Sequence, residues 1–368
     1  MNPTPVDTTA LTTTVLWAAF ALAVVFGAVA QRTRFCTMGA LGDVFTMGDT
    51  TRLRMWVLAI AVAVLGFNAM VGLGWVQAGK SIYGGARVPW LSLVAGGLLF
   101  GFGMVLGSGC GSRSLVRLGS GNLKSLVVLV MLGLGAFATI KGITAVLRVG
   151  TVDRVFFDLP QGQDLPSLLG SAVTVAPWLG AAVALTMVAW VLARPEGRGA
   201  DVWLGGVGVG AVVVALWWVS GRLGYLAEDP NTLEEVFLAT NSRRMEALSM
   251  AGPVGYTIDW LLLFSDRSKT LTIGIVAVGG TVVGSALVAL AQRSFRWEGF
   301  RGTEDTANHV VGGLLMGVGG VTALGCTIGQ GLSGVSTLSV GSLIALAAIC
   351  VGGWLGLRYQ SWRIERMT

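Results

Sequence analysis

Long apolar runs alternate with short polar segments along the whole chain. Nine of these runs could form membrane-spanning helices, at approximately 11–31, 54–76, 91–107, 124–147, 168–193, 202–220, 270–291, 308–324 and 340–358. Several exceed the roughly 18 apolar residues that distinguish a spanning helix from a buried helix of a soluble protein. The pattern therefore predicts an all-α polytopic membrane protein with about nine transmembrane helices.

Composition supports this fold class. Of the 368 residues, 54% are hydrophobic and 12% are charged, and a soluble domain carries about twice that charged share. No polar stretch is long enough for a separate soluble domain, so we expect one membrane transport domain over 1–368. The first apolar run follows an acidic residue and no Lys or Arg, unlike the basic start of a signal peptide, and we expect it to be retained.

The basic residues predict the orientation of the chain. The net charge of +6 does not indicate a nucleic-acid partner, because in a membrane protein the placement of Lys and Arg matters more than their sum. With the N-terminus outside and the C-terminus in the cytoplasm, most of them fall in inner loops: Arg32, Arg34, Arg52, Arg54, Arg113, Arg117, Lys124, Arg194, Arg198, Arg293, Arg296, Arg301, Arg358, Arg363 and Arg366.

A glycine-rich phrase occurs twice. "GGLLFGFGMVLGSGCGS" at 96–112 matches "GGLLMGVGGVTALGCT" at 312–327 after a shift of 216 positions, which aligns Cys110 with Cys326. An odd number of predicted spans separates the two copies, so they face opposite sides of the membrane. This parity predicts an inverted repeat with halves at approximately 11–147 and 202–358.

Four segments are neither spans nor ordinary loops: 32–53, 108–123, 222–268 and 325–339. The stretch "GCTIGQGLSGVSTLSVG" at 325–341 has no charge, is rich in Gly and Ser, and is too short to cross. Irregular backbone at membrane depth is tolerated only where protein buries it or where it lines a cavity. We therefore expect re-entrant loops or short helices that plunge from both faces and line a path.

The residue types in these segments suit a small anion. Glycines let backbone N–H groups turn toward one point, and short helices present their N-termini. Neutral hydroxyl and amide donors bind an anion without trapping it. The candidate path residues of this kind are Gly109, Gly111, Ser112, Gly325, Thr327 and Gln330.

Three of the four cysteines lie in these segments or at their mouths. A buried thiol of Cys36, Cys110 or Cys326 is a weak donor and a soft, polarizable partner, which matches a sulfur-bearing anion. Each could instead be a small hydrophobic residue, as we expect for Cys350 in the ninth run. There is no C-x-x-C and only one histidine, so a thioredoxin-like redox pair and a multi-histidine metal or haem site are excluded, and we expect no metal and no cofactor.

Basic residues flank two of the cysteines. Arg113 and Arg117 lie four positions apart, on one helix face, and Arg34 lies two positions before Cys36. Arg113 and Arg117, and likewise Arg34, could gather or release an anion at the inner mouth. They could equally be ordinary residues of inner loops, which are basic in most membrane proteins.

The three cysteine motifs together resemble the YeeE/YedE family of bacterial sulfur transporters. They are "RTRFCTMGAL" around Cys36, "GSGCGSRSLVRLGSGN" around Cys110 and "LGCTIGQGLSGVSTLS" around Cys326. The resemblance implies an inner-membrane importer of thiosulfate, with an hourglass-shaped body and functional roles for these three cysteines. It also implies a cytoplasmic sulfurtransferase of the TusA type, which we expect to be a separate protein. Some relatives are linked to selenium, so the exact anion stays open.

The sequence thus predicts uptake of thiosulfate, or a closely related sulfur anion, by exchange of hydrogen bonds at a cysteine-lined constriction. No G-x-x-x-x-G-K-[ST] motif occurs, so we expect no ATP-driven step in this chain. A membrane thiol oxidoreductase or sulfurtransferase that forms a persulfide is an alternative. The lack of C-x-x-C and of a general base argues against such an enzyme. A channel for another small solute is a third interpretation.

Overall fold

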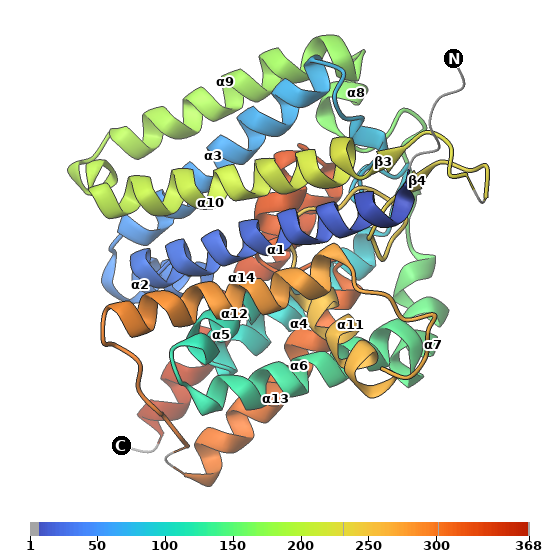
Figure 1. The fold of residues 1–368 in the computed structure, drawn as a ribbon. Helices are drawn as coiled ribbons and strands as arrows, with labels where there is room; N and C mark the ends of the chain where they lie inside the picture. The colour runs from blue at the N-terminus through green and yellow to red at the C-terminus, as the bar shows by residue number, and fades with distance from the viewer. Residues whose placement is uncertain (1–6, 231, 301, 367–368) are drawn as a thin grey trace.

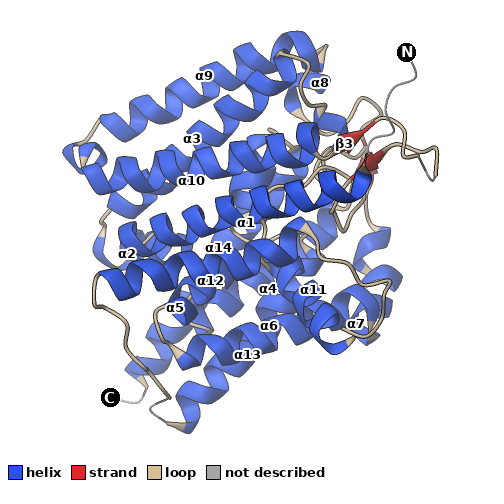
Figure 2. Ribbon diagram, in the orientation of Figure 1, coloured by secondary structure: helices blue, strands red, loops and turns tan. Residues whose placement is uncertain are grey.

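The computed structural model describes residues 7–366 except 231 and 301, and helices dominate it (Figures 1 and 2). The long helices are α1 (Thr8–Thr33), α3 (Thr51–Gly72), α4 (Trp90–Leu106), α6 (Leu123–Lys141), α9 (Ala172–Leu192), α10 (Ala200–Trp218), α12 (Ile273–Ala291), α13 (Thr303–Thr322) and α14 (Val340–Glu365). Shorter helices are α2 (Thr37–Met47), α5 (Gly111–Gly119), α7 (Ile143–Gly150), α8 (Leu165–Leu168) and α11 (Ala251–Leu262). Two antiparallel ribbons pair β1 (Arg87–Val88) with β2 (Phe157–Asp158) and β3 (Tyr225–Leu226) with β4 (Val236–Phe237).

Eight helical segments within the described ranges are long and apolar enough to cross a membrane. The prediction of a multi-pass, all-α membrane protein is confirmed, and eight of the nine expected spans lie in these segments. The eighth expected span, 308–324, forms α13, and the first turn of this helix carries Glu304 and Asp305. The expected span 124–147 was too long, because α6 ends at Lys141, where Gly142 adopts extended backbone, and α7 begins a new helix.

The long helices run between two faces of the molecule (Figure 1). We call the face with the start of α1 the N-side and the face with the end of α14 the C-side. In Figure 1 the N-side lies to the right, near α7, α8 and β3, and the C-side lies to the left, near α2. The chain joins its helices by α2, α5 and turns at the C-side and by longer irregular segments at the N-side.

The two helices with the repeated glycine-rich phrase, α4 and α13, pack against each other in opposite directions. A Cβ added to Gly103 would lie 2.8 Å from the carbonyl oxygen of Gly312, and one added to Gly319 would lie 2.6 Å from the carbonyl oxygen of Gly96. Glycine is therefore required for this close backbone contact. The repeated phrase builds one crossing in the middle of the molecule.

Each helix of this crossing has a second long partner. α4 packs along α14, and α13 packs along α6. Outside this group, α1 packs along α12 and α10 packs along α3, while α9 covers the outer side of α3 (Figure 1).

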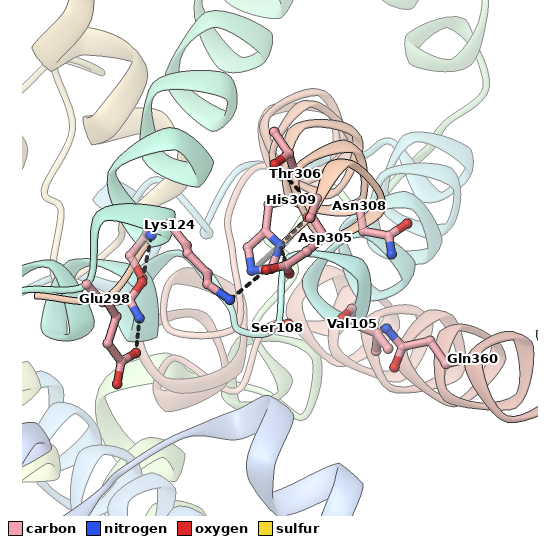
Figure 3. A network of polar contacts seen from close by, with 12 residues as sticks. Val105, Ser108, Lys124, Glu298, Asp305, Thr306, Asn308, His309 and Gln360 are labelled. Atoms are coloured by element: carbon pink, nitrogen blue, oxygen red, sulfur yellow. Dashed lines mark hydrogen bonds and ion pairs between the residues drawn. The ribbon is translucent and has the colours of Figure 1, made fainter. Parts of the chain in front are cut away.

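A polar network ties α13 to its neighbours at the C-side (Figure 3). Lys124 Nζ at the start of α6 lies 2.6 Å from Asp305 Oδ2. His309 is 5% exposed, and its Nδ1 lies 2.7 Å from the Asp305 carbonyl oxygen. Gln360 of α14 donates from Nε2 to the carbonyl oxygen of Val105 at 3.2 Å. These contacts fix the C-side ends of α4, α6, α13 and α14 relative to one another.

At the N-side, one carboxylate holds α6, α11 and the following loop together. Lys141 and Lys269 each place Nζ 2.8 Å from Oδ2 of Asp259. Asp259 is buried, so the two ammonium groups offset the cost of taking its charge out of water.

Candidate functional site

The three cysteines follow the ends of three helices in the same way. Arg34 after α1, Ser108 after α4 and Leu324 after α13 have φ values of 54°, 55° and 57°. A residue other than glycine seldom adopts this left-handed conformation, and such residues cluster where the surrounding structure holds a functional segment. In each case the cysteine comes two residues later.

The hydrogen bonds of the three turns are also the same. The residue before each cysteine donates its N–H to the carbonyl five positions earlier: Phe35 to Ala30 at 3.1 Å, Gly109 to Met104 at 2.8 Å and Gly325 to Gly320 at 2.8 Å. This bond is typical of a Schellman helix end. The same hydrogen-bonded turn therefore fixes the backbone position of the cysteine after each of the three helices.

Each cysteine also begins a new helical segment. Cys36 is the N-cap of α2 and its Sγ accepts the N–H of Gly39 at 3.3 Å. Cys110 immediately precedes α5. Cys326 accepts the N–H of Gly329 at 3.4 Å, at the start of the π-helical segment Gly329–Gly334. Helix N-termini carry unpaired N–H groups and a partial positive charge, so all three thiols lie where an anion is favoured.

The turns bring the thiols together between the two faces. Cys110 and Cys326 are buried, at 0% and 1% exposure. The Cys36 thiol and the Thr327 hydroxyl are close enough to Cys110 to interact with it electrostatically, and Cys110 Sγ lies 3.3 Å from the hydroxyl oxygen of Ser112. Cys326 faces backbone N–H groups at the start of α11. The arrangement is a row of weak donors with no fixed charge inside it.

Buried polar atoms beside the cysteines lack hydrogen-bond partners in the described part of the chain. They are Thr37 Oγ1, which follows Cys36, Thr327 Oγ1, which follows Cys326, and Oε1 of Gln330. The Nε2 of Gln330 donates to a backbone carbonyl at 2.6 Å, which fixes the direction of the side chain. Buried polar atoms normally have partners, so these atoms are available to a solute in the constriction.

A cavity of about 140 Å³ reaches the Cys326 turn from the N-side. Leu324 and Gly325 contribute to its lining, together with the loops 73–89 and 224–250 and helix α11. Its polar lining residues are Tyr83, Asn241, Ser242, Glu246, Ser249 and Tyr256. The sequence analysis missed Tyr83 and Glu246, because neither loop repeats a motif. The one available signal was a single glutamate in the otherwise uncharged stretch "MEALSMAGPVG".

A second cavity, of about 400 Å³, opens at the C-side and has a basic lining. Arg32 in this cavity is paired with Asp201 at 3.4 Å. Arg34 and Arg113 also line it, and neither forms an ion pair with an acidic residue in the described ranges. Arg113 interacts electrostatically with Cys36 and Cys110. Among the residues that line the two cavities, basic side chains therefore occur only in the C-side cavity.

The other predicted site residues lie around the same turns. Gly109 places its backbone against the side chain of Arg113, and Gly111 packs against Leu132. Arg117 donates from Nη1 to the carbonyl oxygen of Ser108 at 3.0 Å, so it holds the Cys110 turn and does not line the C-side cavity. Cys350 lies within α14, apart from the three turns. Within the described residues, no three His, Cys, Asp or Glu side chains gather as a metal site would require.

Comparison with known proteins gives matches over most of the chain. A family model described as sulphur transport matches residues 32–355. The chain is 27% identical to the thiosulfate transporter TsuA of Escherichia coli K12, over 89% of this chain and 90% of that protein. It is also 27% identical to the thiosulfate transporter TsuA of Spirochaeta thermophila, over 92% and 97%. A shorter match, 32% identical over 25% of this chain, relates it to 21% of the probable transporter YedE of Escherichia coli K12.

The family match includes all three cysteine turns and both cavities almost entirely. It favours transport over the enzyme that the sequence left as an alternative. With its spanning helices, the chain is a multi-pass membrane transporter. It belongs to the sulphur transport family, YeeE/YedE, which confirms the resemblance of its three cysteine motifs.

Proposed function

We propose that this chain carries thiosulfate, or a closely related small sulfur anion, into the cytoplasm. The observation that carries the proposal is the convergence of Cys36, Cys110 and Cys326, each at a helix start, between cavities that reach them from opposite faces. Two relatives that are similar over nearly their whole length are named thiosulfate transporters.

On this proposal the anion enters the N-side cavity and meets Cys326 first, then Cys110, then Cys36. The S–H groups act as donors, and the hydroxyl of Thr327 lies between the first two thiols. Helix N-termini add positive potential without adding a charged side chain. Each hydrogen bond is weak enough to exchange for the next, so the anion moves without a covalent bond to the protein.

Arg34 and Arg113 receive the anion in the C-side cavity in this scheme. Both guanidinium groups line this opening beyond the thiols, so they attract the anion after it has passed the constriction. Ser112 adds a neutral hydroxyl donor along the constriction, whereas Gln330 has its Nε2 bonded to the Ala323 carbonyl and offers only the acceptor Oε1 there. Gly109, Gly111 and Gly325 keep side chains out of it, so the path narrows only at the thiols in an hourglass shape.

We also propose the inverted repeat, with halves at 11–147 and 202–358. In support, Ser108 and Leu324 occupy equivalent positions with the same left-handed backbone. A twofold axis between the halves would relate α1 to α10, α3 to α12, α4 to α13 and α6 to α14. The packing fits this relation, because α4 packs on α14 as α13 packs on α6, and α1 packs on α12 as α10 packs on α3.

Orientation and partners complete the proposal. The excess of Lys and Arg at the C-side supports a bacterial inner-membrane protein with its N-terminus outside and its C-terminus in the cytoplasm. The anion would then leave from the basic cavity toward a separate TusA-like sulfurtransferase. Labelling of an introduced cysteine near each terminus by an impermeant reagent in whole cells tests the orientation.

Uptake of radiolabelled thiosulfate by a host without its own importers tests the function. We expect accumulation that unlabelled thiosulfate suppresses and sulfate does not. Absence of uptake in a host with the protein folded in its membrane contradicts the proposal. Electrical conductance in proteoliposomes would favour a channel. A stable cysteine adduct in mass spectrometry would favour the sulfurtransferase.

A further inference from the structure

The N-side cavity contains one carboxylate, and the transport scheme above does not use it. Glu246 lines the cavity on the loop before α11. No described Lys or Arg forms an ion pair with it, and none of the residues that line the cavity is basic. An ionised carboxylate at this position would repel a divalent anion as it approached the Cys326 turn.

The backbone holds Glu246 in place. Its N–H donates to Ser220 Oγ at 2.8 Å, and its Oε1 accepts the N–H of Ser242 at 2.8 Å. The preceding residue, Met245, forms a backbone bridge with Ser81 and thereby joins the loop 224–250 to the loop 73–89. The carboxyl group therefore cannot swing away from the cavity without breaking these contacts.

Few titratable groups face this carboxyl. They are Tyr83 from the loop 73–89, Tyr256 from α11 and, deeper, Cys326, and the Tyr83 phenol interacts with both Glu246 and Cys326. Helices α6, α12 and α13 contribute no titratable side chain to the cavity lining; their residues there are Ile140, Gly274, Gly320 and Val321.

Two nearby basic groups, Arg244 and Lys80, are engaged elsewhere. Arg244 points its Nη1 toward the carbonyl oxygen of Ser81 at 3.4 Å, and Lys80 is paired with Glu235 at 2.6 Å. Withdrawal from water raises the pKa of the Glu246 carboxyl above its ordinary value, although N–H groups of Ser242 and Asn241 oppose the shift.

We propose that Glu246 is a proton-binding residue that takes up a proton together with the transported anion, and that its ionised form excludes the anion from the Cys326 turn. This inference rests on the proposed function. The neutral carboxyl is a hydrogen-bond donor in the same cavity, and the Tyr83 phenol beside it interacts electrostatically with both Glu246 and Cys326. With the N-side outside, each proton that accompanies a divalent anion cancels one of the two charges that must enter against an inside-negative potential.

Thiosulfate uptake by proteoliposomes at external values between about pH 5 and pH 8 tests this proposal. Thiosulfate stays divalent over this range, so a pH dependence reports on the protein. We expect the wild-type initial rate to fall up to tenfold per pH unit above the pKa of the carboxyl, because only the protonated form admits the anion. Glu246→Gln, which resembles the neutral carboxyl, should give a flat profile.

Two further variants are matched to this one. Glu228→Gln changes an exposed glutamate of the same loop and should keep the wild-type profile. Glu246→Asp keeps a titratable group and should keep a pH dependence. A profile of Glu246→Gln that follows the wild type overturns the proposal.

Calorimetry on the wild type decides the question even if a variant fails to fold. Thiosulfate is titrated into the purified protein in buffers of different ionisation enthalpy, which counts the protons taken up. We expect close to one proton per anion above the pKa of the carboxyl, and binding with no proton uptake overturns the proposal. Uptake that is flat with pH also overturns it and leaves the proposed function standing, whereas no thiosulfate uptake at any pH overturns the proposed function itself.

Discussion

The Cys110 turn and the Cys326 turn have the same backbone and different neighbours. Both follow a glycine-rich helix, both use a left-handed residue, and both end in a buried cysteine. Beyond Cys110, helix α5 carries Arg113 into a basic C-side cavity. Beyond Cys326, the segment Gly329–Gly334 has no charge, and the cavity holds tyrosines and one glutamate.

This difference separates what the repeat supplies from what each face adds. Each copy of the glycine-rich phrase leads into the same turn and presents a buried cysteine, and the two turns point from opposite ends because α4 and α13 run in opposite directions. The surrounding loops then make the N-side cavity nearly neutral and the C-side cavity basic. An anion can therefore be admitted without a deep charge trap and received where water screens it.

Removal of the central thiol should have the largest effect. Cys110 interacts with Cys36, Ser112 and Thr327, so Cys110→Ala removes the donor between the two other thiols. A hydrogen bond to a charged group contributes about 1.5–3 kcal/mol, so we expect thiosulfate uptake to fall about 100-fold. Cys326→Ala should lose less, about 10-fold, because backbone N–H groups beside it remain.

Cys350→Ala is the matched control for both, since Cys350 lies within α14. Its uptake rate should equal that of the wild type. If Cys110→Ala and Cys326→Ala also equal the wild type, the thiols do not line the path and the comparison of the two turns loses its functional meaning.

The glycine crossing that supports both turns should be intolerant of side chains. A Cβ at position 319 would lie 2.5 Å from the Phe100 nitrogen, so Gly319→Val must separate α4 from α13. We expect a loss of about 2 kcal/mol or more in stability, measured as a lower melting temperature in detergent. Gly279→Ala in α12 is the control, because no atom lies within 4 Å of the added Cβ. Equal melting temperatures would refute the close crossing.

The role of the basic C-side cavity can be tested by removing one of its positive charges. Arg113→Gln removes an unpaired guanidinium from the C-side cavity, and we expect the uptake rate to fall roughly fivefold, equivalent to about 1 kcal/mol. The loss should shrink at high salt, because salt screens the exposed part of the cavity. Arg32→Gln changes a guanidinium already paired with Asp201 and should have a smaller effect. An equal loss in both variants would mean that only total charge matters.

We expect the smallest effect, on stability, from the N-side contacts of Asp259 with Lys141 and Lys269. Burial disfavours the charge of Asp259, but hydrogen bonds from Lys141 and Lys269 outweigh it and hold the pKa of this carboxyl below its ordinary value. The stabilisation is therefore present above about pH 4 and is lost as the pH falls through the folded-state pKa.

Asp259→Asn should accordingly lower stability by about 1 kcal/mol or less at neutral pH, since both lysines are partly exposed. Thermal unfolding at several pH values measures the difference, which should close in acid. Asp266→Asn is the control, because an amide oxygen can still accept the N–H of Ser268. If the stability difference between wild type and Asp259→Asn grew as the pH fell, the pKa of Asp259 would not be lowered by folding.

Several features of the site followed from sequence alone. The repeated phrase placed Cys110 and Cys326 in equivalent positions, and parity put them on opposite faces. The charge-free stretch at 325–341 predicted irregular backbone, and the structure has a π-helical segment there. These features are local, because glycine spacing and the absence of charge act within a few residues of the chain.

Other features could not be read in this way. The Arg34 turn has the same geometry as the turns at Ser108 and Leu324, yet "RTRFC" shares little with "LGSGC" or "ALGC". Arginine in a left-handed conformation gives no sequence signal, since the rest of the fold holds it there. The expected span 124–147 was overextended for a related reason: Gly142 could lie within a helix or end one, and in the folded chain its extended backbone ends α6.

The sequence by itself determined the membrane fold and the repeated glycine-rich phrase that leads to Cys110 and Cys326, because hydropathy and glycine spacing are properties of neighbouring residues. Only the tertiary structure decided that Tyr83 and Glu246 reach the Cys326 turn and that Arg34 and Arg113 share a cavity with each other. Those placements depend on contacts between loops distant in the chain, such as the bridge between Ser81 and Met245. No pattern along the chain encodes a contact that only the folded helices bring within reach.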